Sequence, residues 1–213
     1  MPRRLSPVVR NHLSALRMLL VFTALTGIIY PLAVTGVAQV AFPDQANGSR
    51  VKRHGKTVGS SLLGQNFTLP GKNSHDPDEP AGPDPGWFQP RPSAGGYDPL
   101  ASGASNLGPN NRKLARTVEQ RRASIAAFDG VEPEDVPADA LTASGSGLDP
   151  HISPDYAYQQ VNRVARARRL KPATVRHLVT EHVRGRVLGF LGQERVNVVE
   201  LNSALRLDAR FAG

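Results

Sequence analysis

The first apolar stretch of the chain is long enough to cross a membrane as a helix. Residues 18–42 carry no charged side chain, and their one strongly polar residue is Gln39. A helix of this length covers about 37 Å at about 1.5 Å per residue, against a bilayer core of about 30 Å. Pro31 would break a helix in water but is tolerated in a membrane helix. We therefore predict a transmembrane helix over 18–42, preceded by a tail over 1–17.

A cleaved signal peptide is the alternative interpretation of this stretch. It would share the basic start, the apolar run and small residues such as Gly36 and Ala38. The apolar core of a signal peptide is only about 7–15 residues long, however, and this run is uninterrupted. Its length favours a retained single-pass anchor.

Residues 43–213 show the pattern of one folded domain that begins with a β-hairpin. The hairpin has its turn at His54-Gly55, and its strand-forming residues are Val51, Val58, Leu62 and Leu63. A segment of this size can bury close to 70% of its unfolded surface without disulfides. The chain has no cysteine, so no disulfide framework exists.

A long stretch without periodicity follows the hairpin. Residues 69–86 are dense in proline, glycine and acid, which predicts an exposed insertion. Residues 87–111 are also irregular, and such segments inside a domain are usually functional or wrapped on a scaffold. The insertion contains four metal-ligand types, at His75, Asp76, Asp78 and Glu79. Prolines at 77 and 80 keep these residues extended, so they do not converge, and we predict no metal site.

The rest of the chain is predicted to be helical, which makes the fold class α+β. The first helix starts at Asn110 or Asn111 and covers about 111–128, with one apolar face formed by Leu114, Val118, Ile125 and Phe128. Ser153 and Pro154 are an N-cap and a first helical residue, and they open a second helix. We expect that helix to continue through RVARARR, with Arg163, Arg166 and Arg169 off its apolar face.

Two further helices complete the predicted domain. Pro172 opens one of them, whose apolar positions are Val175, Leu178, Val179, Val183 and Phe190. The last begins at Asn197, with Glu200 at the spacing of a capping box. The domain is therefore a small sheet with several C-terminal helices.

Net charge decides neither the partner nor the orientation of the chain. The formal charge of +8 is spread along the sequence with few aromatics near basic runs, which argues against nucleic-acid binding. Four basic residues lie on each side of the apolar run: Arg3, Arg4, Arg10 and Arg17 before it, and Arg50, Lys52, Arg53 and Lys56 after it. The positive-inside rule is therefore tied.

The stretch LTASGSGLDPHISP, residues 141–154, contains the residue types of a hydrolase. Its polar residues are Ser144, Ser146, Asp149, His151 and Ser153. A serine nucleophile needs a base within hydrogen-bond reach and an oxyanion site, commonly at a strand–turn–helix elbow. The G-x-S-x-G form is absent here, and turns plus a helix cap explain the same residues. We predict a positioning role for this stretch, with catalysis by Ser146 and His151 as the alternative.

No cofactor motif appears elsewhere in the sequence. There is no glycine-rich phosphate loop, and nothing has zinc or calcium spacing. The residues alone therefore indicate a membrane-anchored α+β domain with no evident active site, and we predict no cofactor and no metal.

Four blocks in order resemble the C subunit of the Kdp potassium-transporting P-type ATPase. They are GSSLLGQNF (59–67), WFQPRPSAGGYDPLASGASNLGPNN (87–111), TASGSGLDPHISPDYAYQQVNRVARAR (142–168) and LGQERVNVVELNSAL (191–205). The likeness runs from about Leu19 to Leu207. Two features depart from the family: residues 69–86 look inserted, and Asn162 replaces a frequent proline.

The resemblance implies a non-catalytic accessory and assembly subunit of an ATP-driven potassium importer in the bacterial cell membrane. The implied partners are a channel-like subunit, an ATP-hydrolysing P-type subunit and a small single-span subunit, besides membrane lipid. The family's topology would put the N-terminus inside and residues 43–213 outside the cytoplasmic membrane. This topology would select one of the two orientations that the equal numbers of basic residues on either side of the apolar run leave open.

The family has also been described as a catalytic chaperone that raises the ATP affinity of the hydrolysing subunit. Gln160 is the residue that matches its suggested nucleotide contact. An external domain would rarely meet cytoplasmic ATP, so the two statements conflict. Beside an apolar helix face, Gln160 is expected to be a hydrogen-bonding core or interface residue.

Overall fold

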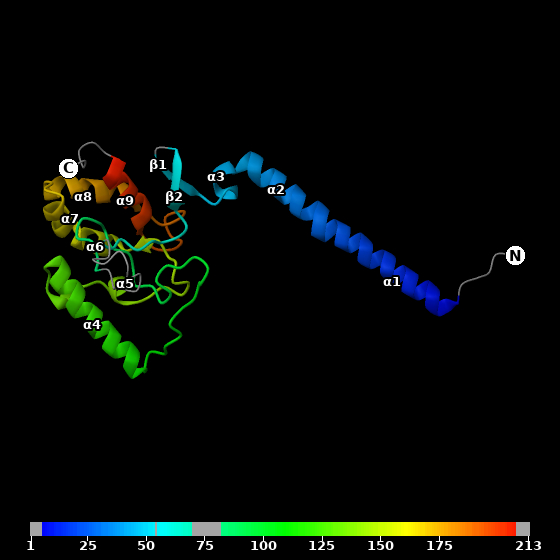
Figure 1. The fold of residues 1–213 in the computed structure, drawn as a ribbon, viewed down its shortest axis with the longest axis horizontal. Helices are drawn as coiled ribbons and strands as arrows, with labels where there is room; N and C mark the ends of the chain where they lie inside the picture. Colours follow the sequence, from blue (N-terminus) through cyan, green and yellow to red (C-terminus); the bar gives the residue numbers. More distant parts are fainter. Residues whose placement is uncertain (1–5, 54, 70–81, 208–213) are drawn as a thin grey trace, which may run out of the picture. The chain divides into compact units, whose positions relative to one another are not determined.

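The computed structural model describes residues 6–53, 55–69 and 82–207, and these form two compact units that divide between Arg50 and Val51. The first unit is helical. Its elements are α1 (Pro7–Ala24), the π-helical turn η1 (Leu25–Ile29), α2 (Tyr30–Ala41) and the short α3 (Pro43–Ala46). Figure 1 shows α1 and α2 as one continuous rod.

The helical rod starts earlier than the apolar run because its first turn is capped. The Ser6 hydroxyl accepts a hydrogen bond from the Val9 N–H at 3.4 Å, and Pro7 occupies the first helical position. Residues Pro7–Ala41 are, in the described part of the chain, the one helix long and apolar enough to cross a membrane. None of the most apolar window is buried against protein.

Pro31 is accommodated by a wider turn just before it. Proline has no N–H to donate to the carbonyl of Gly27, four residues earlier, and its ring crowds that carbonyl. At η1 the Tyr30 N–H donates to the Leu25 carbonyl, five residues back, instead of to the fourth. The helix continues through the proline as a result.

The second unit contains two small antiparallel sheets. Strands β1 (Arg50–Arg53) and β2 (Lys56–Ser60) form the predicted hairpin, whose turn includes Gly55 at φ +78°; His54 lies outside the described residues. Leu62 and Leu63 follow β2 as exposed residues, so their assignment to a strand was wrong. The other sheet has the order β3 (His151–Ile152), β5 (Arg195–Asn197), β4 (Val183–Arg184), with Val196 paired to both Ile152 and Val183.

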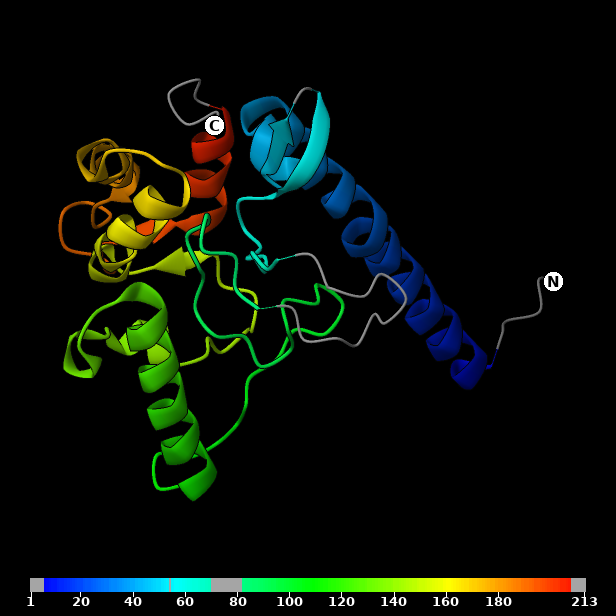
Figure 2. The same cartoon turned by 60° about the vertical axis from the view of Figure 1, so that its left-hand side comes forward.

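Helices surround this second sheet. They are α4 (Arg112–Asp129), the 3-10 turn η2 (Pro133–Asp135), α5 (Ala138–Leu141), α6 (Pro154–Gln159), α7 (Val161–Ala167), α8 (Pro172–His182) and α9 (Val198–Leu207). Figures 1 and 2 show α4 at one end of the domain, with α7, α8 and α9 at the other. The α+β class is confirmed.

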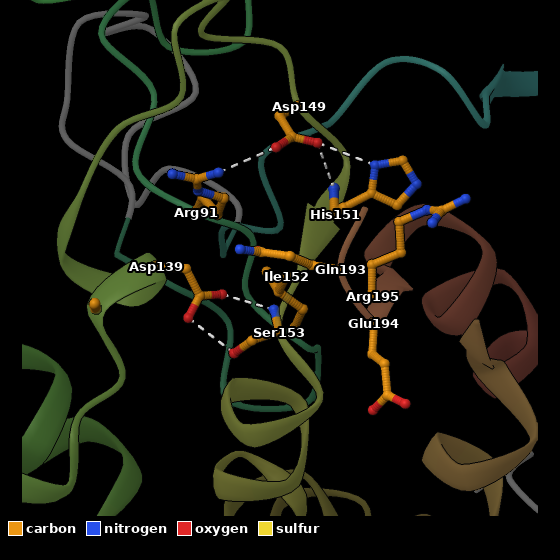
Figure 3. A pocket seen from close by; sticks show the side chains of 10 residues that line it. Arg91, Asp139, Asp149, His151, Ile152, Ser153, Gln193, Glu194 and Arg195 are labelled. Carbon is orange, nitrogen blue, oxygen red and sulfur yellow. Dashed lines mark hydrogen bonds and ion pairs between the residues drawn. The ribbon is translucent and has the colours of Figure 1, made fainter. Parts of the chain in front are cut away.

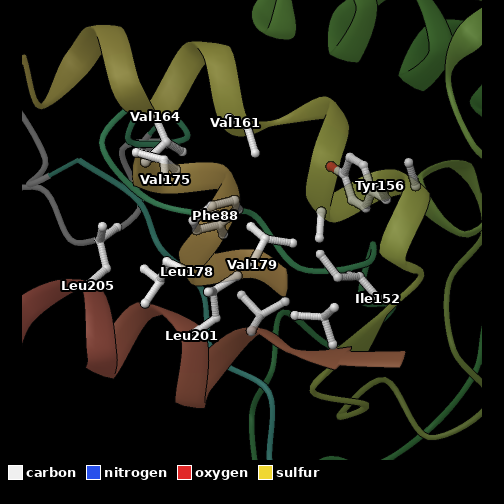
Figure 4. Close-up of a cluster of buried hydrophobic side chains, with 14 of the residues drawn as sticks. Phe88, Ile152, Tyr156, Val161, Val164, Val175, Leu178, Val179, Leu201 and Leu205 are labelled. Carbon is white, nitrogen blue, oxygen red and sulfur yellow. The ribbon is translucent and has the colours of Figure 1, made fainter. Parts of the chain in front are cut away.

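The core lies between α7, α8 and α9, with Phe88 from the irregular segment at its centre (Figure 4). The Phe88 side chain is fully buried. The apolar residues around it are Val161, Val164, Val175, Leu178, Val179, Leu201 and Leu205. At about 25 cal/mol per Å², burial of such side chains is the main favourable term in folding the domain. The irregular segment is therefore wrapped on the helices by its own apolar anchor.

Helix caps predicted from the sequence are confirmed. Asn111 caps α4 by accepting from the Lys113 N–H at 2.8 Å, and Ser153 caps α6 by accepting from the Tyr156 N–H at 3.1 Å. The Asn197 side chain accepts from the N–H groups of Val199 and Glu200 at the start of α9.

Two helix predictions were wrong in extent. The helix after Pro154 breaks at Gln160 into α6 and α7, and Arg163 lies buried at 5% exposure instead of off the apolar face. The helix from Pro172 ends at His182, because Val183 takes the extended backbone that pairs with β5. Phe190 is accordingly exposed, and not part of a helix face.

Candidate functional site

The predicted loop 141–154 surrounds an Asp149-centred cluster (Figure 3). One Asp149 carboxylate oxygen accepts from the Arg91 guanidinium at 3.2 Å. The other accepts from the His151 backbone N–H at 3.0 Å and contacts the His151 ring Nδ1 at 3.1 Å. Asp149 therefore joins the end of the loop to the irregular segment that carries Arg91.

Burial and hydrogen bonding act in opposite directions on Asp149. Desolvation by burial favours the neutral acid, while the hydrogen bonds from His151 and the positive charge of Arg91 favour the carboxylate. The favourable contacts win, so the pKa of Asp149 lies below its usual value. Near neutral pH, the cluster holds an ionised aspartate.

Two adjoining clefts share this cluster as a wall. One has a volume of about 480 Å³ and is also lined by Asp139, Ser153, Glu194 and Arg195. The other, of about 540 Å³, lies between Leu62-Leu63 and residues 144–151. Both are open and carry charges of both signs, which does not select one class of small ligand.

The serines of the loop are used for structure. Ser146 Oγ accepts from the Leu148 N–H, Ser144 Oγ accepts from the Gly147 N–H, and Ser153 Oγ donates to Asp139 while capping α6. Over the described residues, no serine hydroxyl hydrogen-bonds to the His151 ring, so no serine is placed for activation by it. The alternative of a hydrolase based on Ser146 and His151 finds no support.

The loop instead holds the irregular segment by its backbone carbonyls. The Ser146 carbonyl accepts from the Gly103 N–H at 2.8 Å, and the Gly147 carbonyl accepts from the Ser93 hydroxyl at 2.6 Å. Gly147 has φ +69°, and a Cβ there would lie 2.7 Å from the Gly103 carbonyl oxygen. Only glycine therefore allows this approach of the two backbones.

Gln160 is at the centre of a second, buried polar cluster. Its side chain is 0% exposed. Its Oε1 accepts from the Gln89 N–H and from Arg163 Nη2, both at 2.6 Å, and its Nε2 donates to the Gln89 carbonyl at 3.1 Å. The amide therefore binds both polar groups of one backbone residue in the irregular segment.

Arg163 extends the same cluster. Its Nε donates to the Asp129 carboxylate at 2.7 Å, and its Nη1 donates to the carbonyls of Pro85 and Trp87. Asp129 also accepts from Gln159 at 2.7 Å. A buried charge pair is stable only when its remaining hydrogen bonds are satisfied. Here the carbonyls of Pro85 and Trp87 and the side chains of Gln159 and Gln160 satisfy them.

Asn202 completes the attachment from α9. Its side-chain oxygen accepts from the Phe88 N–H at 3.0 Å, and its nitrogen donates to the Phe88 carbonyl at 2.9 Å. Two buried amides, Gln160 at the junction of α6 and α7 and Asn202 on α9, thus bind two successive backbone residues. The sequence analysis identified Gln160 but missed the parts played by Arg91, Asp129, Arg163 and Asn202, because an isolated polar residue in a helix gives no sign of its distant partner.

The four residues of metal-ligand type in the insertion, His75, Asp76, Asp78 and Glu79, lie outside the described residues. Among the residues that the structure does describe, no group of three His, Cys, Asp or Glu side chains is arranged to hold a metal ion.

Comparison with known proteins identifies the family. The family described as "K+-transporting ATPase, c chain" matches residues 12–207. A potassium-transporting ATPase KdpC subunit of Kineococcus radiotolerans is 53% identical over 95% of this chain and 96% of its own length. KdpC subunits of Streptomyces avermitilis and Sorangium cellulosum are each 50% identical, over 91% and 90% of this chain and 91% and 94% of their own. This chain therefore belongs to the KdpC family, the c chains of K+-transporting ATPases.

Proposed function

We propose that this chain is a non-catalytic accessory subunit of an ATP-driven potassium importer. The observation that carries the proposal is the match to KdpC subunits along nearly the whole chain. The clusters at Asp149 and Gln160 fit it, because most of their polar groups are bonded to the chain itself; Arg91 Nε and Gln159 Oε1 are the buried polar atoms without a partner among the described residues. The chain's contribution is then to shape and hold a complex, and the chemistry belongs to other subunits.

The proposed position is at the bacterial cell membrane, with one spanning helix. The apolar helix within Pro7–Ala41 supports an anchor, since its surface is not covered by the rest of the chain. We place residues 1–17 inside, the span at 18–42, and residues 43–213 outside as one domain. The chain has no cysteine, so a single introduced cysteine would be the only thiol available for labelling in a test of this orientation.

The proposed partners are a channel-like subunit, an ATP-hydrolysing P-type subunit and a small single-span subunit, together with membrane lipid. The names of the relatives, which describe subunits of a potassium-transporting ATPase, support a multi-subunit complex. The spanning helix and the external domain offer two separate surfaces for such contacts.

The resemblance suggests that Gln160 contacts a nucleotide, and this suggestion is separate from the proposed accessory role. For ATP to reach the Gln160 amide, the backbone of Gln89 would have to leave it, because that backbone now occupies both ends of the amide. We propose instead that Gln160 acts by holding residues 85–89 on the helices. Any influence on ATP affinity then passes through the shape of the domain.

Cysteine labelling and co-purification test the proposal. Leu100→Cys introduces one thiol at a side chain that is almost fully exposed. It should react with a membrane-impermeant maleimide in intact cells, and labelling only after lysis would refute the external placement. Separately, the tagged chain should co-purify from mild detergent with a channel-like protein and a P-type ATPase. Purification without either would refute the accessory role.

A further inference from the structure

A third cleft, of about 530 Å³, lies between α4 and the irregular segments beside it, and we call it the α4 cleft. Its charged lining residues are Lys113 and Arg121, and among the described residues no aspartate or glutamate lines it. The two clefts at Asp149 differ, because at least one carboxylate lines each of them. A hollow that carries charge of one sign concentrates molecules of the opposite sign. The α4 cleft therefore favours an anion.

The two cations of the α4 cleft have no counter-ion within the described part of the chain. None of the ion pairs there includes Lys113 or Arg121. Arg121 is half-buried, and its Nη1 donates to a neutral acceptor, the Leu141 carbonyl, at 2.9 Å. Burial removes hydration without adding an opposite charge, so it lowers the pKa of Arg121. A bound anion would supply the missing charge.

Helix α4 presents these cations on one face. Lys113, Thr117 and Arg121 follow one another at four-residue spacing, which places them along one side of the helix, and all three line the cleft. Lys113 lies in the first turn, where the helix dipole favours acids, yet the first turn of α4 has no acid. An anion near Lys113 would therefore be stabilised by the cationic side chains and by the start of the helix together.

The remaining lining of the α4 cleft indicates an organic ligand. Leu107, Leu114 and three alanines supply apolar contacts. The volume lies within the range of about 300–1,000 Å³ that is typical of small-molecule sites. Figures 1 and 2 both show the start of α4 at the end of the domain away from β2, which belongs to the hairpin that follows the apolar helix. The cleft is therefore remote from the part of the domain that the chain enters from that helix, which favours a ligand from solution.

We propose that the α4 cleft binds a small soluble organic anion. Its phosphate or carboxylate group lies between Lys113 and Arg121, and its apolar part packs on Leu107 and Leu114. The Arg121 guanidinium suits either oxyanion, because its donors match two oxygens at once, and Lys113 adds a second positive charge. This site needs no contact with the other ATPase subunits, so it does not depend on the accessory role.

Calorimetric titration of the full chain in phosphatidylcholine nanodiscs tests the ligand class. The probe is phenyl phosphate, with phenol as the match without charge and inorganic phosphate as the match without an apolar part. Phenyl phosphate should bind saturably, more weakly as salt is raised, and at least about 10-fold more tightly than either match. Absence of saturable binding, or equal binding of either match, would overturn the proposal. Nanodiscs that contain phosphatidylglycerol should leave the binding unchanged, and its loss there would assign the cleft to a lipid headgroup instead.

Charge-matched variants locate the binding. Lys113→Gln and Arg121→Gln should each weaken binding of phenyl phosphate about 10-fold, as expected for loss of one charge-assisted hydrogen bond. Arg116→Gln is the control, because Arg116 is an exposed arginine of α4 that does not line the cleft, and it should bind as the unmodified chain does. Trp87 emission checks that each variant is folded, and Lys113→Gln alone decides the matter if Arg121→Gln unfolds. Equal effects of Lys113→Gln and Arg116→Gln would show only a general influence of charge and would refute the site.

Discussion

Replacing Gln160 by leucine removes every hydrogen bond of its side chain while keeping a similar volume. Three polar groups then lose their partner: the N–H and the carbonyl of Gln89, and Nη2 of Arg163. Each buried group left without a partner costs about 1–3 kcal/mol. Gln89 is only partly buried and Arg163 keeps its other bonds, so we expect a loss of about 3–6 kcal/mol. This is a large share of the about 5–15 kcal/mol that stabilises a typical domain.

Urea unfolding of the full chain in detergent measures this loss. The only tryptophan, Trp87, lies in the segment that Gln160 holds, and the Arg168 and Arg206 guanidinium carbons lie 3.9 Å and 4.1 Å from the centre of its ring. Its emission therefore reports release of the segment. With a urea dependence of about 1–3 kcal/mol per molar, a loss of about 3–6 kcal/mol should lower the midpoint by about 1–6 M.

Matched variants make the measurement specific. Gln120→Leu is the control, because Gln120 is exposed on α4 and leucine has a similar helix propensity. Gln160→Glu keeps an acceptor for the Gln89 N–H and for Arg163 but loses the donor to the Gln89 carbonyl, so its loss should be smaller than that of Gln160→Leu. If Gln160→Leu and Gln120→Leu unfold at the same urea concentration, the attachment reasoning is wrong. A stable Gln160→Leu chain that lowers the ATP affinity of the assembled complex would favour the nucleotide contact.

Two further predictions concern the Asp149 cluster. Ser146→Ala and His151→Ala, made singly, should leave ATP-driven potassium uptake unchanged and alter stability by no more than about 1 kcal/mol; loss of uptake by orders of magnitude in an assembled complex would restore the catalytic hypothesis. The pKa of Asp149 is depressed by folding, so its stabilising effect is present above the unfolded pKa of about 3.9 and disappears as pH falls through the folded pKa. Asp149→Asn should therefore lower the urea midpoint at pH 7 but much less at pH 3, and an equal deficit at both values would contradict this.

Local signals in the sequence located most of the helices and their caps. Asn111, Ser153 and Asn197 were recognisable because a cap acts on N–H groups two or three residues away. The membrane-spanning helix was recognisable because a long uncharged apolar run is enough to indicate one. The class of fold followed from such features alone.

Contacts between distant residues were beyond the sequence. Arg163 was expected on an exposed face because arginine is rarely buried without a partner, and its partner, Asp129, comes from another helix. Val183 continued the helical apolar pattern of α8, but pairing with β5 takes it into a strand. Phe190 lost its predicted helix for the same reason. The resemblance named the family, while the attachment of residues 85–89 required the folded chain.

The last prediction concerns the contact of the apolar helix with its neighbours, and it follows from Pro31. Because proline cannot donate to the Gly27 carbonyl, that carbonyl lacks its normal helical donor and lies at a position without a side chain. A neighbouring helix can approach closely there and supply a hydrogen bond. Gly36 also has no side chain, but no proline follows it four residues later, so its carbonyl keeps a normal helical donor. Since the wider turn at η1 reduces the rotation per residue, the two glycines lie somewhat less than half a turn apart, on different faces.

Leucine at either glycine fits within the chain itself, which makes the comparison clean. A Cβ at Gly27 would meet only Thr23 Cγ2, at 4.0 Å, and a Cβ at Gly36 would meet nothing within 4 Å. Any loss must therefore come from a neighbouring helix, because membrane helices associate through close packing and not through exclusion from water. Gly27→Leu should sharply reduce the amount of the other ATPase subunits that co-purify, while Gly36→Leu should have little effect. Full retention in both variants would mean that the helix is only a tether and that the external domain alone assembles the complex.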